Sequence, residues 1–282
     1  MRRKKLKELT IKDNFLFGAV MSEQENCRRF LELTLKIPIA SVDVSLEKSF
    51  VYHPEYKGVR LDVYAKDEKN THYNVEMQVI PKPELSKRAR YYHGQMDMEL
   101  LISGSDYTEL PDSYVIFLCD FDPFGKGKYC YTFEHTSKEI PEMSMKDGSK
   151  TIFLSTCGEN RDEVSEEMIK FLKFVRADLN ESEGDFADDF VENLQESIRY
   201  IKNSRKMEER FMILEEMLND ERAQGILCGK REDILELLEE LGEVPEEVRE
   251  RIEKETNPEF LKHWHKLAAR VNSVEIFKKE MF

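Results

Sequence analysis

The order of hydrophobic and polar residues predicts an α/β region followed by a helical one. Apolar residues at near-helical spacing predict helix over 11–36, and a second helix is predicted over 86–103. Stretches that alternate in polarity, or are continuously apolar over strand length, predict β-strands. The predicted strands cover 42–52, 59–66, 72–80, 114–119, 128–134 and 151–155. From residue 163 onward the apolar positions recur at helical spacing almost throughout.

This change of pattern divides the chain into two predicted regions. We expect an α/β domain over 1–160 and an all-helical region over 161–282. The helical part is acidic, because residues 151–282 contain 20 Lys+Arg and 33 Asp+Glu, whereas residues 1–90 contain 18 and 13. An anionic ligand is therefore repelled less by the N-terminal third than by the C-terminal half.

Composition excludes several classes of protein. The chain has 282 residues and a formal net charge of −14, so a uniformly basic coat for nucleic acid is excluded. There is no run of 18 apolar residues, and we expect no membrane span. The five cysteines are scattered and never form a CxxC pair, which predicts reduced thiols in the cytoplasm and no zinc site.

Two of the predicted strands are expected to form a β-hairpin across the polar turn 67–71. If the turn is centred on Lys69, residues whose numbers add up to 138 lie opposite each other. Strict alternation then predicts one face with Arg60, Asp62, Tyr64 and Lys66 and the other with Val59, Leu61, Val63 and Ala65.

The predicted register sets two carboxylates, Asp62 and Glu76, directly opposite each other, where like charges are destabilising. A divalent cation between them removes the repulsion, and Mg²⁺ prefers one or two carboxylates together with water and phosphate oxygens. Gln78 shares this face and is placed to orient a metal-bound water. The alternative is a solvated outer face on which Arg60 neutralises the pair, and the sequence leaves both interpretations open.

A cluster of basic and aromatic residues follows the hairpin on the predicted helix 86–103. Lys and Arg contact phosphates, and Tyr hydrogen-bonds phosphate or stacks on bases. The predicted DNA contacts are Lys87, Arg88, Arg90, Tyr91 and Tyr92. The alternative is a solvated helix face with tyrosines that are partly in the core.

Residues 58–64 and 73–79, with stretches 10–15, 87–93 and 117–123, carry a family resemblance. They resemble the PD-(D/E)xK nuclease signature, specifically the recombination-promoting nuclease and transposase family of bacteria. The resemblance implies a restriction-endonuclease-like core, with a mixed β-sheet flanked by helices. It also implies Mg²⁺-dependent DNA cleavage, with Mn²⁺ as a substitute metal, in recombination or mobile-element biology.

By position, the resemblance implies that Asp62 and Glu76 are catalytic metal ligands. Gln78 occupies the position at which the superfamily usually has lysine, and Leu61 replaces the proline of the signature. Such nucleases often add a carboxylate from the first helix, for which Asp13 is the best-placed candidate. Glutamine donates a hydrogen bond but brings no charge, so a cationic stabiliser of the transition state is missing.

Two functions therefore stay open. The first is a metal-dependent DNA endonuclease, for which Asp62, Glu76 and Gln78 carry the chemistry. The second is a nuclease-fold protein whose main role is binding or assembly, with weak or no cleavage, which the missing lysine and the acidic helical half favour. RNA is a further possible substrate. We also expect a homodimer through the helical run 186–222, whose apolar stripe exceeds what a core requires.

Overall fold

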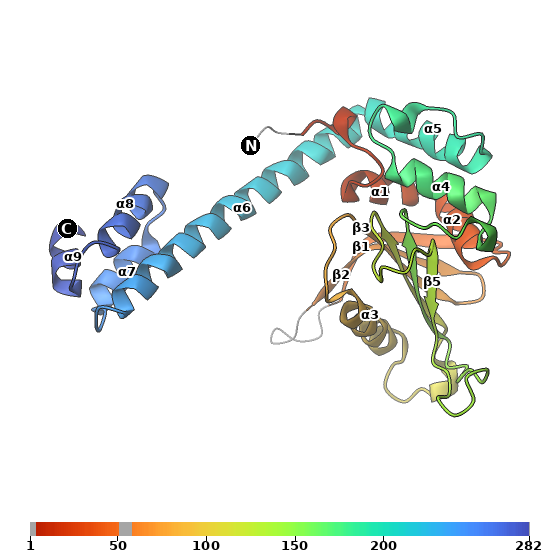
Figure 1. The fold of residues 1–282 in the computed structure, drawn as a ribbon, viewed down its shortest axis with the longest axis horizontal. Helices are drawn as coiled ribbons and strands as arrows, with labels where there is room; N and C mark the ends of the chain where they lie inside the picture. Colours follow the sequence, from red (N-terminus) through yellow and green to blue (C-terminus); the bar gives the residue numbers. More distant parts are fainter. Residues whose placement is uncertain (1–3, 51–57, 282) are drawn as a thin grey trace. The chain divides into compact units, whose positions relative to one another are not determined.

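The computed structural model describes residues 4–50 and 58–281, and the chain forms two compact units, Met1–Glu208 and Glu209–Phe282. Within the described part of the first unit, six strands form one sheet in the order β1-β2-β3-β4-β6-β5 (Figure 1). The strands are β1 (Val42–Phe50), β2 (Val59–Asp67), β3 (His72–Gln78), β4 (Ser113–Cys119), β5 (Cys130–Phe133) and β6 (Ser149–Ser155). Residues 51 and 52, predicted to extend the first strand, lie outside the described ranges.

The sheet is mixed, as the family resemblance implies. Strands β1, β2 and β3 pair antiparallel, β3, β4 and β6 pair parallel, and β5 returns antiparallel to β6. A parallel pair needs a crossover connection, and helix α3 (Leu85–Leu100) supplies it between β3 and β4. The predicted α/β fold with helices around a mixed sheet is therefore confirmed.

Helices cover both faces of the sheet (Figure 1). Helix α3 lies on one face, and the other face carries α1 (Asn14–Met21), α2 (Gln24–Leu35), α4 (Glu166–Arg176) and α5 (Asp189–Asn203). Aromatic contacts join three of these helices, since Phe171 of α4 lies 5.6 Å from Phe30 of α2 and 5.7 Å from Phe190 of α5 between ring centroids. The boundary predicted at residue 160 therefore needs correction, because α4 and α5 pack against the first helices and extend this unit to Glu208.

The predicted helix 11–36 is two helices in the structure. The first begins at Asp13, whose Oδ1 accepts a hydrogen bond from the backbone N–H of Phe15 at 3.1 Å. The second ends at Lys36, which adopts the left-handed conformation with φ 56°. The short break between them lets both helices lie on the same face of the sheet.

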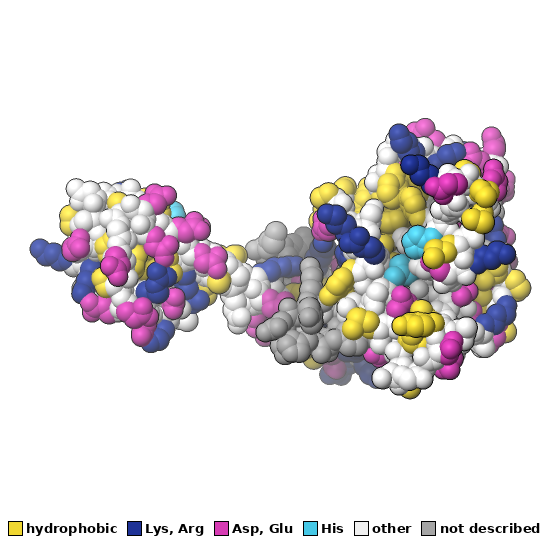
Figure 2. Space-filling view, turned by 90° about the horizontal axis from the view of Figure 1, so that it is seen from below, with side chains coloured by type: hydrophobic (Ala, Val, Ile, Leu, Met, Phe, Trp, Pro, Cys, Tyr) yellow, Lys and Arg dark blue, Asp and Glu magenta, His cyan; other side chains and the backbone are white. Residues whose placement is uncertain are grey.

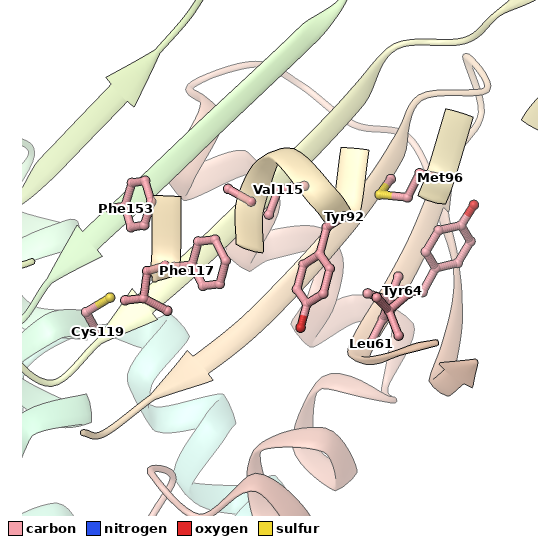
Figure 3. Packing of buried hydrophobic residues seen from close by; sticks show 11 residues of the cluster. Leu61, Tyr64, Tyr92, Met96, Val115, Phe117, Cys119 and Phe153 are labelled. Atoms are coloured by element: carbon pink, nitrogen blue, oxygen red, sulfur yellow. The ribbon is translucent and has the colours of Figure 1, made fainter. Parts of the chain in front are cut away.

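An aromatic stack fills the space between α3 and the sheet (Figure 3). Phe117 of β4 stacks on Tyr92 of α3 at 6.3 Å and on Phe153 of β6 at 5.0 Å between ring centroids. Further buried side chains of this cluster are Val59, Leu61, Tyr64, Leu85, Ala89, Met96, Val115 and Cys119. The stack fixes α3 against β4, and it thereby sets the position of every side chain on the inner face of α3.

The second unit is helical, and its core forms around Trp264. The boundary between the units falls inside α6; the helices are α6 (Arg205–Glu239), α7 (Glu246–Lys254), α8 (Pro258–Ala268) and α9 (Val274–Met281). On the face drawn in Figure 2, acidic and basic side chains of this unit are interspersed. Among the described residues, none of the helices combines the length and apolar character needed to cross a bilayer.

Replacing Phe117 with alanine tests the role of the aromatic stack. Phe117 is completely buried, so Phe117→Ala should lower the free energy of unfolding by about 3–5 kcal/mol, from lost burial and the cavity that remains. Urea unfolding followed by circular dichroism measures the loss. Tyr107→Ala is the control, because Tyr107 is 86% exposed and its removal should change stability by about 0.5 kcal/mol or less. Equal effects of the two changes would contradict this account of the core.

Candidate active site

Glu76 lies at the centre of the site, near the C-terminal end of β3. Its neighbour in the parallel ladder is Phe117 of β4, and laterally paired residues direct their side chains to the same face of a sheet. Glu76 therefore faces α3 together with the aromatic stack. Its side chain has no exposed surface, so this carboxylate needs hydrogen bonds and compensating charge from its surroundings.

Two side chains of α3 supply that compensation. The Nη2 atom of Arg88 lies 2.5 Å from Oε2 of Glu76, which makes a charge-assisted hydrogen bond and an ion pair. Arg88 also donates from Nε to the hydroxyl oxygen of Tyr92 at 2.5 Å, and the Tyr92 hydroxyl lies 3.4 Å from the same Glu76 oxygen. Residues four apart share one face of a helix, which is why Arg88 and Tyr92 both reach Glu76.

Asp62 approaches Glu76 from the neighbouring strand. The observed pairs of β2 and β3 include Val63 with Val75 and Tyr64 with Asn74, so the predicted register, with residue numbers adding up to 138, is confirmed. Extended by one residue, this register sets Asp62 opposite Glu76. The backbone N–H of Asp62 donates to Oε1 of Glu76 at 3.2 Å, so the strand contributes a main-chain hydrogen bond to the carboxylate.

The strict alternation predicted for β2 is wrong at Asp62. Val59 and Leu61 do not face away from Tyr64, because all three belong to the cluster beneath α3 (Figure 3). The ladder of paired residues between β2 and β3 also ends at Val63, immediately before Asp62. At this point of the strand, the backbone N–H of Asp62 is directed at the Glu76 carboxylate.

The electrostatics of the site agree with this close approach. Burial, with the negative charge of Asp62 adding to it, raises the pKa of Glu76 from its ordinary value to about 7. The charge of Arg88 and the N–H of Asp62 act in the opposite direction but do not cancel the effect. Burial and the charge of Glu76 also raise the pKa of Tyr92 to about 12, so its hydroxyl stays protonated at neutral pH.

Gln78, at the end of β3, is nearly buried on the same face as Glu76. Its Oε1 accepts a hydrogen bond from Nη1 of Arg88 at 3.4 Å, and its backbone oxygen accepts one from the N–H of Asp120 at 2.9 Å. The residue at the usual lysine position therefore directs an acceptor toward a cation that comes from α3.

Asn74 was not singled out from the sequence. It is buried, two residues before Glu76 on the same face; its amide lowers the pKa of Glu76, yet neither Oδ1 nor Nδ2 makes a well-formed hydrogen bond among the described residues. Buried amides are almost always hydrogen-bonded, so this pair of atoms marks a polar position beside Glu76 that suits ordered water. Sequence reasoning had only the weak signal of an amide at alternate strand spacing from Glu76 and Gln78.

The predicted cluster of DNA contacts divides between two faces of α3. Arg88 and Tyr92 point inward to Glu76, whereas Lys87, Arg90 and Tyr91 are exposed. The helical period explains the split, since positions 88, 89 and 92 face the sheet, whereas positions 87, 90 and 91 face outward. The sequence interpretation assigned all five residues one role because it had no contact partner for Arg88.

The structure does not bring Asp13 into a cluster with the other two acids. Asp13 is the N-cap of α1, and its Oδ2 lies 4.0 Å from Nζ of Lys4. Across residues 4–50 and 58–281, there is no group of three or more His, Cys, Asp or Glu side chains arranged to hold a metal ion. A metal at this site would therefore use Asp62 and Glu76, with the remaining positions taken by amide, water or substrate oxygens.

A second ion pair lies beside the end of β4 and was not predicted. Lys12 Nζ lies 3.1 Å from Oδ2 of Asp120 and donates to the backbone oxygen of Arg176 at 2.9 Å. Thr156 donates to Oδ1 of Asp120 at 3.0 Å. This pair ties the segment before α1 to the strand end next to Gln78, so we assign it a structural role.

With this geometry in view, comparison with known families gives a match over residues 12–225, to the PD-(D/E)XK nuclease family transposase. The chain belongs to this PD-(D/E)XK family. The match covers more than half of the chain and includes Asp62, Glu76, Gln78 and Arg88. Neither the curated proteins nor the solved structures gave a match. Membership supports a nuclease or transposase-like role for the protein.

PD-(D/E)XK nucleases generally use divalent metals, and the donors at this site suit one. Two carboxylates, one of them with a raised pKa, leave negative charge that a cation neutralises. The buried amide of Asn74 lies beside them and offers a polar neighbour to the water ligands that Mg²⁺ usually keeps. The residues therefore fit a hard divalent ion held by Asp62 and Glu76.

The raised pKa of Glu76 predicts a pH-dependent stability difference for Glu76→Gln. Between the ordinary pKa and about 7, folded wild-type protein binds more protons than the unfolded chain, so its stability falls as pH rises through this window. The glutamine variant lacks this titration. Its melting temperature relative to the wild type should therefore increase from pH 5 to pH 8, measured by calorimetry in the presence of a chelator.

The control for this measurement is Glu109→Gln, which changes an exposed carboxylate of the same unit. Its melting temperature should follow that of the wild type at both pH values. A difference between wild type and Glu76→Gln that stays constant from pH 5 to pH 8 would contradict the assignment of a raised pKa to Glu76.

Proposed function

We propose that this PD-(D/E)XK protein is a metal-dependent DNA endonuclease that acts in recombination or on mobile elements. The observation that carries the proposal is the buried carboxylate of Glu76, which meets the N–H of Asp62 and the guanidinium of Arg88 in a chain of this nuclease family. A buried carboxylate lowers the stability of the fold, and ionisable groups in such unfavourable surroundings are common at catalytic sites.

In this mechanism Asp62 and Glu76 would hold a divalent metal, Mg²⁺ or in its place Mn²⁺. When bound, the ion supplies a Lewis acid for the phosphodiester and lowers the pKa of the attacking water. Gln78 orients that water through its side-chain amide. One P–O bond forms to the water oxygen and another breaks toward the sugar oxygen; the water releases one proton and the leaving oxygen gains one.

The exposed side chains of α3 are proposed to contact the DNA backbone. Lys87 and Arg90 bring positive charge to the outer face of the helix that carries Arg88, and Tyr91 adds an aromatic ring. The N-terminal third of the chain has a net positive charge, so it repels a polyanion less than the acidic helical part does.

Nicking of supercoiled plasmid tests the proposal. Wild-type protein should cleave with Mg²⁺ or Mn²⁺ and not with a chelator, whereas Glu76→Gln and Asp62→Asn should lose at least about 100-fold in rate, since the metal loses a charged ligand. Glu109→Gln controls for removal of an exposed carboxylate and should cleave as the wild type does. Equal cleavage by wild type and Glu76→Gln would refute the role given to Glu76.

A second candidate is a nuclease-fold protein that binds or assembles on nucleic acid with little or no cleavage. The observation that favours it is Gln78, which stands where the family signature has lysine. Calorimetry separates the two functions: retained DNA binding without measurable Mn²⁺ affinity would favour the binding protein. Competition between duplex DNA and duplex RNA decides the substrate class.

We also propose that the protein forms a homodimer through α6. Met212, Ile213 and Met217 on its N-terminal half are each more than half exposed, and so is Ile226 further along. Pairing of two copies would cover this apolar surface. Light scattering should therefore give twice the chain mass of 33.3 kDa at micromolar concentration, and Met217→Glu with Ile213→Glu should shift it to the single mass. A single-chain mass for the wild type across a concentration series would refute dimerisation.

A further inference from the structure

Arg88 is the cation that stands closest to Glu76, and it is also accessible to solvent. Glu76 has no exposed surface, whereas 26% of the Arg88 side chain is exposed. Arg88 lies in the first turn of α3, which begins at Leu85 shortly after β3 ends at Gln78. A phosphate approaching this carboxylate from solvent therefore meets a guanidinium group.

The guanidinium is fixed in place yet retains donors for a ligand. An arginine has five N–H groups. Within the described structure, Nε donates to Tyr92, Nη2 to Glu76 and Nη1 to the acceptor oxygen of Gln78. Two N–H groups then remain, and the planar fork of arginine matches the oxygens of a phosphate.

The net charge of the site with metal and phosphodiester bound is zero only when the charge of Arg88 is included. Asp62, Glu76 and Arg88 together carry one net negative charge. A divalent ion and one phosphodiester together add one positive charge, so the loaded site becomes neutral. Without the guanidinium it would keep an unbalanced negative charge in a largely buried place, which is costly.

We propose that Arg88 supplies from helix α3 the positive charge that the signature lysine would bring from β3, and that it contacts the scissile phosphate of the nucleic acid. This inference rests on the proposed nuclease function. Gln78 does not replace the lysine in this arrangement; its oxygen helps to hold the arginine. Arg88 transfers no proton, and it stabilises the negative charge that builds up on the phosphoryl oxygens as the water bond forms and the leaving bond breaks.

The test compares Arg88→Gln and Arg88→Lys with the wild type and with Arg161→Gln, which removes an exposed arginine on the short helix Arg161–Glu163. Single-turnover cleavage is measured at saturating Mn²⁺ and DNA. Arg88→Gln should be about 100-fold slower or more, comparable with the loss of one oxyanion donor. Arg88→Lys should keep a rate within about tenfold of the wild type, and Arg161→Gln should match the wild type.

Mn²⁺ affinity, measured by calorimetry without DNA, gives a readout that a structural role would not produce. Arg88→Gln should bind Mn²⁺ as tightly as the wild type or severalfold more tightly, because a cation beside the metal ligand is gone. Weaker Mn²⁺ binding together with slow cleavage by both variants would mean that Arg88 only holds Glu76, and would overturn the proposal.

The outcomes separate this inference from the proposed function. Absence of cleavage by the wild type with either metal would refute the nuclease function itself. Wild-type cleavage that persists at full rate in Arg88→Gln would refute the role of Arg88 alone. If Arg88→Gln fails to fold by circular dichroism, Arg88→Lys decides: a rate within tenfold of the wild type supports the proposal, and a rate equal to the protein-free blank overturns it.

Discussion

The burial of one carboxylate, Glu76, constrains much of the first unit. A carboxylate without solvent must be matched by positive charge and hydrogen bonds, or it takes up a proton. Here the match comes from two directions: Arg88 and Tyr92 on α3, and the N–H of Asp62 on β2. Glu76 is on β3 and its partners are on α3 and β2. Both the position of α3 along the sheet and the pairing of β2 with β3 must therefore be correct for Glu76 to be charged while buried.

The aromatic stack between α3 and the sheet makes that register possible. Phe117 of β4 packs against both Tyr92 and Phe153, which holds the helix at a fixed place along the strands. Tyr92 belongs at once to this stack and to the hydrogen-bonded group around Glu76. Because Tyr92 is shared, a substitution that shifts the aromatic packing also shifts the hydrogen bonds around Glu76.

The geometry around Glu76 also bears on the replacement of the signature lysine by Gln78 in this chain. In the proposed assignment, Asp62 and Glu76 are the acidic residues of the signature, and the chain belongs to the PD-(D/E)XK family. Gln78 takes the position of the usual lysine in that assignment, and its oxygen turns toward Arg88. Charge at such a site depends on where a side chain ends in space, and a helix that lies over the strand can deliver it as well as the strand itself.

The sequence determined the hairpin and its register, because a five-residue polar turn between two strand-like segments is a local property that leaves few pairings open. The mixed sheet followed from the family resemblance. The sequence also placed Asp62 and Glu76 together. It did not determine the break in alternation at Asp62, the inward direction of Arg88 or the inclusion of α4 and α5 in the first unit. These features follow from contacts between segments far apart in the chain, such as Phe30 with Phe171, and only the tertiary structure decides which face of a strand or helix meets a partner.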